Sequence, residues 1–316
     1  MSMVLYLVVP CYNEEEIIVE SAAKLEAKMN VLMDSGLISD KSKVLLVNDG
    51  SVDATGRLIH DIREENNMFS CINFSRNFGH QNAVMAGYMF AKDKCDAVIS
   101  LDADLQQDIN AIDEFIERFN EGYEVVYGVR NSRDTDGFFK KLTSQIFYKI
   151  MRIFGCEIIP NHADYRLLSN RVLNALAEYK ETNVFLRGLI PTLGFNSCIV
   201  HFDVHERSAG KSKYSLKKMV NLAVDGITSH SIRPMHIIFS LGWIVLLLAF
   251  IYFVYIIVVL VMDKTVPGWT SLVMSIWILG GLQLIAIGCI GEYVGKNYLE
   301  TKNRPRYIIE SVEHNQ

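Results

Sequence analysis

Ile99-Ser-Leu-Asp-Ala-Asp-Leu-Gln106 joins an apolar run to a pair of carboxylates. The apolar run begins at Ala97 and predicts a buried strand, which Asp102 and Asp104 follow. Side chains of an extended chain repeat every two residues, so we expect both acids to point the same way. Their oxygens suit Mg²⁺ or Mn²⁺ holding a phosphorylated substrate. These residues alone leave open a solvated turn after a strand.

Alternating strands and helices surround this stretch. Apolar runs predict strands at residues 4–9, 43–47, 69–74, 97–101 and 124–129, and helical spacing predicts helices at residues 17–32, 53–65, 80–91 and 109–121. This alternation is typical of an α/β fold with a mostly parallel, Rossmann-like sheet covered on both faces. Asn13 with Glu16 resembles a capping box for the first helix, and Asp108 is the expected N-cap of the fourth.

Polar signatures follow four of the predicted strands. They are Pro10-Cys-Tyr-Asn-Glu14, Asn48-Asp-Gly-Ser51, Ser75-Arg-Asn-Phe-Gly79 and Asp102-Ala-Asp104. Ligands of such sheets bind beyond the carboxyl ends of the strands, so this co-location indicates a site. The sequence has no GxGxxG, and Gly210-Lys211-Ser212 lacks the leading glycine of a P-loop because position 205 is His. Dinucleotide-binding and P-loop folds are therefore excluded.

Two long stretches without charge, residues 237–262 and 269–290, predict two transmembrane helices. Lysine and arginine flank the pair on its outer sequence sides, whereas the loop at residues 263–268 holds a single Lys. The positive-inside rule therefore places both termini in the cytoplasm, and no N-terminal signal contradicts this. The GxxxG of Gly291 and Gly295 is a weak indication of a homo-oligomer.

Four segments follow from these patterns. We expect a cytoplasmic domain at residues 1–214, an amphipathic juxtamembrane helix suited to the bilayer surface at 215–235, a transmembrane hairpin at 236–290 and a cytoplasmic tail at 291–316. The six cysteines show no CxxC spacing, so reduced thiols are expected and a zinc site is not. The net charge of −5 argues against a general nucleic-acid binder.

Five ordered motifs resemble those of the family 2 glycosyltransferases with a GT-A fold. They are Val8-Val-Pro-Cys-Tyr-Asn-Glu14, Val47-Asn-Asp-Gly-Ser51, Ser75-Arg-Asn-Phe-Gly79, Leu101-Asp-Ala-Asp-Leu-Gln106 and Asp164-Tyr-Arg-Leu167. With Arg207-Ser-Ala-Gly-Lys-Ser-Lys-Tyr214 and the two spans, they are similar to the polyprenyl-phosphate group, which includes dolichol-phosphate mannose synthase and bactoprenol glucosyltransferases. The resemblance covers nearly the whole chain. It departs from many relatives at Gln107-Asp108-Ile109, where they carry an acid or His and then Pro-Pro.

The resemblance implies an inverting enzyme of the inner (cytoplasmic) membrane. It would move a hexosyl or N-acetylhexosaminyl group from a nucleotide sugar, with uridine favoured over guanosine, to polyprenyl (undecaprenyl) phosphate for cell-envelope glycan modification. The nucleotide-binding residues that it implies are Pro10, Tyr12, Glu14, Asp49 and Asp102. The implied ligands of Mg²⁺ or Mn²⁺ are Asp102, Asp104 and Gln106. The expected catalytic residues are Asp104, Asp164, Arg130 and Arg207, and the candidates for the acceptor phosphate are Arg130, Arg133, Arg207, Lys211 and Lys213.

The acceptor chemistry limits what Asp164 has to do. A phosphate monoester has a second pKa of about 6, so its oxygen is largely deprotonated at neutral pH and needs no strong base. We therefore expect Asp164 chiefly to orient the acceptor and the metal, while a simple ion pair with Arg166 stays open. Helix-start and turn roles stay open for Glu14 and Asp49, as do solvated positions for Arg133 and the lysines.

The sequence leaves one alternative function open and disfavours another. A non-catalytic GT-A-like scaffold, or an accessory of a lipid-sugar flippase, is the alternative function. A processive polysaccharide synthase is disfavoured, because the sequence contains no Gln-x-x-Arg-Trp motif. His80, His162 and His205 lack metal-ligand spacing, so each is interpreted as an incidental loop residue.

Overall fold

The protein is described by a computed structural model over residues 2–131, 154, 162–181, 184–203, 231, 233–261 and 268–314. The chain divides into two compact units. The first comprises Met1–Tyr148, Glu157–Leu216 and Arg304–Gln316, and the second comprises Lys149–Cys156 and Lys217–Asn303.

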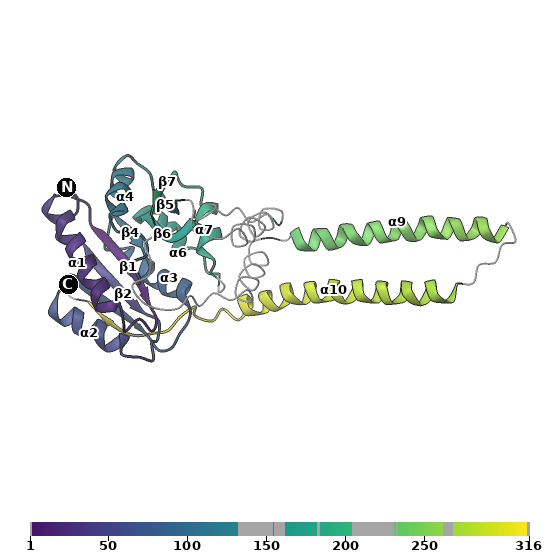
Figure 1. Cartoon of the computed structure of the whole chain (residues 1–316), viewed down its shortest axis with the longest axis horizontal. Coiled ribbons are helices and arrows are strands. Elements are labelled where there is room, and N and C mark those ends of the chain that lie inside the picture. Colours follow the sequence, from purple (N-terminus) through teal and green to yellow (C-terminus); the bar gives the residue numbers. More distant parts are fainter. Residues whose placement is uncertain are drawn as a thin grey trace. The chain divides into compact units, whose positions relative to one another are not determined.

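The first unit is built on a mixed, mostly parallel sheet, which confirms the predicted α/β fold class (Figure 1). Its strands are β1 (Leu5–Cys11), β2 (Lys43–Asn48), β3 (Phe69–Phe74), β4 (Ala97–Ser100), β5 (Val125–Arg130), β6 (His162–Ser169), β7 (Ser197–Phe202) and β8 (Ile309–Glu313). They lie in the order β7-β5-β6-β4-β1-β2-β3-β8. Strand β6 runs antiparallel to β4 and β5, and β8 runs antiparallel to β3.

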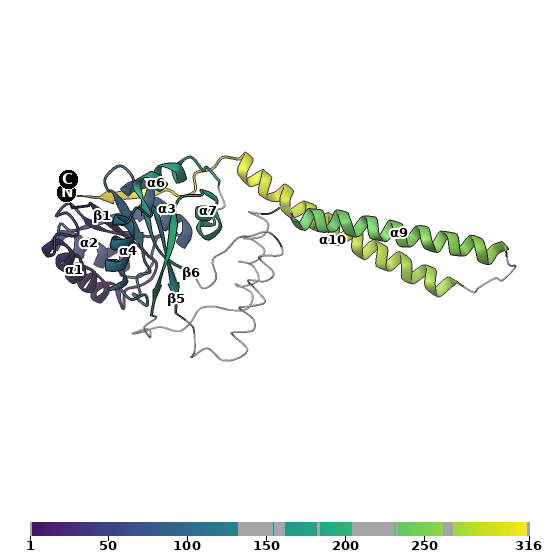
Figure 2. The ribbon, with the colours of Figure 1, turned by 90° about the horizontal axis from the view of Figure 1, so that it is seen from above.

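Helices cover both faces of this sheet (Figure 2). One face packs against α1 (Ile18–Asp34), α2 (Thr55–Glu65) and α4 (Ala111–Asn120), and the other against α3 (His80–Ala91), α6 (Asn170–Ala177) and α7 (Leu186–Thr192). Strand side chains alternate between faces, so Leu7 and Val9 of β1 join the first core while Tyr6 and Val8 join the second. Full burial of each such side chain contributes about 1.5–3 kcal/mol, which explains the continuous apolar run of β1.

The residues predicted to cap two of the helices were wrong. Asn13 adopts a left-handed φ of 53°, and its Oδ1 accepts the N–H of Val52 at 3.0 Å instead of capping α1. The α1 N-cap is Ile17, without a side-chain cap. Helix α4 begins after Asn110, whose N–H donates to Asp108 Oδ1 at 2.9 Å. Asp108 therefore shapes the turn before the helix and is not its N-cap.

The second unit contains two long helices, α9 (Arg233–Val261) and α10 (Trp269–Thr301), which run antiparallel (Figures 1 and 2). By length and composition, Arg233–Tyr252 and Ile278–Thr301 could each cross a membrane, and both windows are exposed. The charge-free spans predicted from sequence thus fall on these helices, except for residue 262, which lies outside the described residues. The expected amphipathic helix at residues 215–235 lies almost entirely outside the described residues.

Candidate active site

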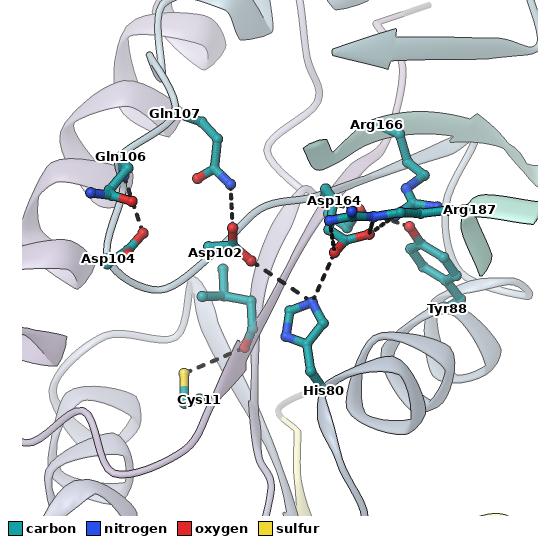
Figure 3. Close-up of polar contacts among 12 residues, drawn as sticks. Cys11, His80, Tyr88, Asp102, Asp104, Gln106, Gln107, Asp164, Arg166 and Arg187 are labelled. Carbon is teal, nitrogen blue, oxygen red and sulfur yellow. Dashed lines mark hydrogen bonds and ion pairs between the residues drawn. The ribbon is translucent and has the colours of Figure 1, made fainter. Parts of the chain in front are cut away.

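The two acids of the central stretch lie in a turn and not on a strand. Strand β4 ends at Ser100, and Leu105 N–H donates to the Asp102 carbonyl at 3.2 Å, with Leu105 at a φ of 45°. The intervening Ala103 is buried, and its carbonyl accepts the Ser21 hydroxyl at 2.6 Å. The two-residue repeat of an extended chain, on which the common orientation was predicted, therefore does not apply. Asp102 and Asp104 have different polar neighbours (Figure 3).

Strand β6 brings a third acid to Asp102. Ser100 of β4 pairs with Arg166 of β6 in antiparallel register. Asp102, two residues after Ser100, and Asp164, two residues before Arg166, therefore lie at the same end of this strand pair. A buried hydrogen-bond chain supports this end: Tyr88 Oη donates to Ser100 Oγ at 2.8 Å, and Ser100 Oγ donates to the Asp164 carbonyl at 2.9 Å.

Two arginines hold the carboxylate of Asp164. Arg187 donates from Nε to Oδ1 at 3.2 Å and from Nη2 to Oδ2 at 2.8 Å, and fully buried Arg166 also pairs with Oδ1. Burial raises the pKa of Asp164, but Arg187 and then Arg166 more than offset it and hold the pKa well below its usual range. The ion pair with Arg166 is thus present, and Asp164 is ionised at neutral pH.

His80 links Asp102 and Asp164, although its spacing in the sequence predicted no role for it. Its Nε2 lies 3.8 Å from Asp102 Oδ1 and 3.7 Å from Asp164 Oδ2, and Figure 3 shows the ring between them. Its position directly after the Ser75–Gly79 motif was the available signal, since that motif follows a strand at the same sheet edge. Arg187 carried no such signal, because α7 lies outside every motif.

A divalent cation fits the chemistry of this turn. Asp102 and Asp104 offer hard carboxylate oxygens at the end of a central strand. Gln107 Nε2 donates to Asp102 Oδ2 at 2.6 Å, and the backbone N–H of Gln106 donates to Asp104 Oδ1 at 3.3 Å. No group of three or more His, Cys, Asp or Glu side chains in the described ranges is arranged to hold a metal. Mg²⁺ often takes only one or two protein carboxylates together with substrate phosphates and water, so the number of acids in this turn is compatible with such an ion.

A cavity of about 570 Å³ lies at the ends of β2 and β3. Tyr12 is the residue predicted for nucleotide binding that lines this cavity. Gly50 and Arg76 line it as well. Such a volume is within the usual range for small-molecule sites. Glu14 donates its backbone N–H to Thr55 Oγ1 at 2.8 Å, and Pro10 is buried in β1 opposite Val47 of β2.

Asp49 contacts the neighbouring loop. Its Oδ1 accepts the N–H of Phe78 at 2.7 Å, and its Oδ2 accepts the N–H of Gly79 at 2.9 Å and the amide of Asn77 at 3.0 Å. Burial raises the pKa of this carboxyl despite those hydrogen bonds and the nearby His80. Asp49 thus holds the conformation of the loop that precedes α3. Its predicted contact with the base of the nucleotide stays a prediction.

The phosphate-binding candidates are only partly described. Arg130 ends β5, where it pairs in register with Phe202 of β7. Arg133, Arg207, Lys211 and Lys213 lie outside the described residues. The structure thus places Asp102, Asp164 and His80 together, and the predicted roles of the arginines and lysines toward phosphate stay predictions.

The sequence model of Glycosyl transferase family 2 matches residues 6–184, which contain the turn, the three acids and most of the residues that line the cavity. The chain belongs to this family. It is therefore a glycosyltransferase, and the mixed α/β sheet is the GT-A-like fold that the resemblance implied.

Family relatives match over almost the full chain. The glycosyltransferase YkoT of Bacillus subtilis (strain 168) is 45% identical over 313 residues, covering 99% of this chain and 93% of the relative. A prophage bactoprenol glucosyl transferase homolog of Escherichia coli (strain K12) is 37% identical, covering 98% and 100%. The bactoprenol glucosyl transferase of Shigella phage SfX is also 37% identical, covering 98% and 99%.

Proposed function

We propose that the protein transfers a sugar from a nucleotide sugar, with a UDP-sugar favoured, to the phosphate of a polyprenyl lipid of the bactoprenol type. The observation that carries this is the placement of Asp102 at a central strand end, where His80 links it to the Asp164–arginine group, with Asp104 in the same turn. The names of two relatives as bactoprenol glucosyl transferases support a lipid acceptor. The exposed apolar helices support a site near a membrane.

The donor would be held at two places. The nucleoside occupies the cavity beside Tyr12, and Asp102 and Asp104, with Gln106, hold Mg²⁺ or Mn²⁺ on the diphosphate. The bound cation supplies Lewis-acid stabilisation of the departing nucleoside diphosphate. Gln107 and His80 restrain the Asp102 carboxylate, which keeps it oriented toward the donor.

The acceptor oxygen would attack the anomeric carbon opposite the departing diphosphate, which inverts that carbon. Because the phosphate monoester is already largely ionised near pH 7, no side chain has to abstract its proton. Asp164 fits an orienting role, since its pKa is too low for an effective base at that pH. Arg130, together with Arg207, Arg133, Lys211 and Lys213, would neutralise the acceptor phosphate.

The charges that flank α9 and α10 favour a cytoplasmic site at the inner membrane, with both termini on that side. An accessory role without catalysis is the competing proposal. The same assay separates the two, because only an enzyme forms lipid-linked sugar.

The test uses the full-length protein in membranes. Radiolabelled nucleotide sugars are offered with undecaprenyl phosphate and Mg²⁺ or Mn²⁺, and the product is extracted into organic solvent. We expect label in the organic phase for one donor, and about a 10²–10³-fold lower rate in Asp102→Asn and Asp104→Asn. Exposed Asp93, on the surface after α3, provides the matched control Asp93→Asn, which should keep full rate. No organic-soluble label from any donor would overturn the proposal.

A further inference from the structure

The strand that follows both apolar helices belongs to the sheet of the first unit. In β8, Val312 pairs with Ile72 and Glu313 with Cys71 of β3, in antiparallel register. The segment is drawn in yellow and ends at the C-terminal label in Figure 1. Strand β8 thereby covers the backbone edge of β3, which would otherwise be unpaired.

Side chains just before β8 and at its end fix the position of this strand. Tyr307 stacks on Phe74 with ring centroids 5.1 Å apart, and Glu313 Oε2 lies 2.8 Å from His60 Nδ1. Arg306 Nε donates to the Glu181 carbonyl at 2.7 Å. These contacts reach α2, β3 and the segment after α6, so the register of β8 does not depend on backbone pairing alone.

Strand β8 also lines the cavity assigned to the nucleoside. Glu310 and Ser311 line it together with Tyr12 and Arg76 from the motif loops. Glu310 is exposed, and its carboxylate is an acceptor only. A nucleoside presents ribose hydroxyls and base N–H groups, which are the donors that such a carboxylate accepts.

A chain of side-chain hydrogen bonds runs from Ser311 into the loop after β2. Asn73 Nδ2 donates to Ser311 Oγ at 3.0 Å, and Asn48 Nδ2 donates to Asn73 Oδ1 at 3.0 Å. Asn48 Oδ1 in turn accepts the backbone N–H of Ser51 at 3.0 Å. The hydroxyl of Ser311 thus orients the Asn73 amide, together with Glu313 Oε1, which accepts from the same Nδ2 at 3.4 Å, and through it the Asn48 amide. The Asn48 amide in turn fixes a loop that also lines the cavity.

We propose that β8 is part of the donor site: Glu310 accepts hydrogen bonds from the nucleoside, and Ser311 positions the amides that shape its pocket. This inference rests on the proposed function. It makes a segment that follows α10 a determinant of nucleotide affinity, outside the family-model match at residues 6–184.

The test measures binding of UDP and of GDP, each with Mg²⁺, to the full-length protein in detergent by isothermal titration calorimetry. For the nucleotide that wild type binds, we expect about three- to tenfold weaker affinity in Glu310→Gln and in Ser311→Ala. Ser311→Thr, which keeps the hydroxyl, should restore the affinity. Val312→Thr is the matched control, because Val312 lies on β8 and does not line the cavity.

The outcomes separate the two proposals. Wild-type affinity in both Glu310→Gln and Ser311→Ala would overturn the role of β8 and leave the proposed function standing. Failure of wild type to bind either nucleotide would overturn the proposed donor site itself. Thermal unfolding of each variant identifies a loss of fold; a loss of affinity at unchanged unfolding temperature, rescued by Ser311→Thr, supports the positioning role.

Discussion

At the scale of single residues, Asp164 is the group whose surroundings most restrict its chemistry. Its carboxylate is nearly buried, and Arg187 and Arg166 hold its pKa well below the usual range. Its charge is therefore constant wherever a family 2 enzyme is expected to work. A folded pKa below the unfolded value of about 4 means that this ion pair stabilises the fold above that pH and is lost only in stronger acid.

This constancy predicts the pH dependence of catalysis. The rate should fall below a pH of about 6, where the acceptor phosphate gains its second proton. Asp164→Asn should lower kcat, because Arg166 and Arg187 lose their partner, but should leave the shape of the pH profile between 6 and 8 unchanged. The measurement is kcat against pH for both proteins. A limb of the profile that disappears in Asp164→Asn would identify Asp164 as the base instead, and full rate in that variant would remove both roles.

Asp49 yields a stability prediction. An asparagine at this position has a single side-chain oxygen, so Asp49→Asn leaves the N–H of Phe78 or Gly79 without its acceptor. We expect a loss of about 1–3 kcal/mol in the free energy of unfolding, measured by denaturant titration. Asp61→Asn, at an exposed position on α2, should change stability by less than about 0.5 kcal/mol. Unchanged stability with lost nucleotide binding would favour direct contact of Asp49 with the base.

At the scale of elements, local pattern was sufficient for the strands and helices before residue 131. The predicted helix at residues 80–91 and strand at residues 69–74 match α3 and β3. Local pattern did not predict the strands whose positions depend on pairing between segments far apart in the sequence. The antiparallel insertion of β6 and the addition of β8 at the edge depend on partners that no local periodicity encodes. The meeting of Asp102, Asp164 and His80 therefore became visible only in the structure.

The close contact between α3 and β1 predicts the effect of enlarging a side chain at this interface. A Cβ on Gly87 would overlap the side chain of Val8, so the helix packs against the strand at this glycine. Gly87→Ala should destabilise the fold by about 1–3 kcal/mol through overpacking. Combining it with Val8→Ala should cost less than the sum of the two single changes, because the smaller strand residue makes room. Free energies of unfolding for the four proteins test this, and strict additivity would contradict the packing argument.

At the scale of the whole molecule, the proposed topology places the loop between α9 and α10 across the membrane from the first unit. Thr265→Cys, in that loop, should react with a membrane-impermeant maleimide added to intact cells. Lys41→Cys, exposed in the first unit, should react only after the membrane is broken, with the wild-type cysteines as background. Labelling of Lys41→Cys in intact cells would reverse the orientation.

The position of β8 in the chain sets an order of events during synthesis. The ribosome makes β3 long before β8, and both apolar helices are translated between them. Until then the edge of β3 has no partner, so the nascent sheet exposes unpaired backbone groups. A polypeptide that stalls before α10 is complete therefore lacks the strand that finishes the sheet. Only a chain that already contains α9 and α10 can therefore complete the sheet of the first unit.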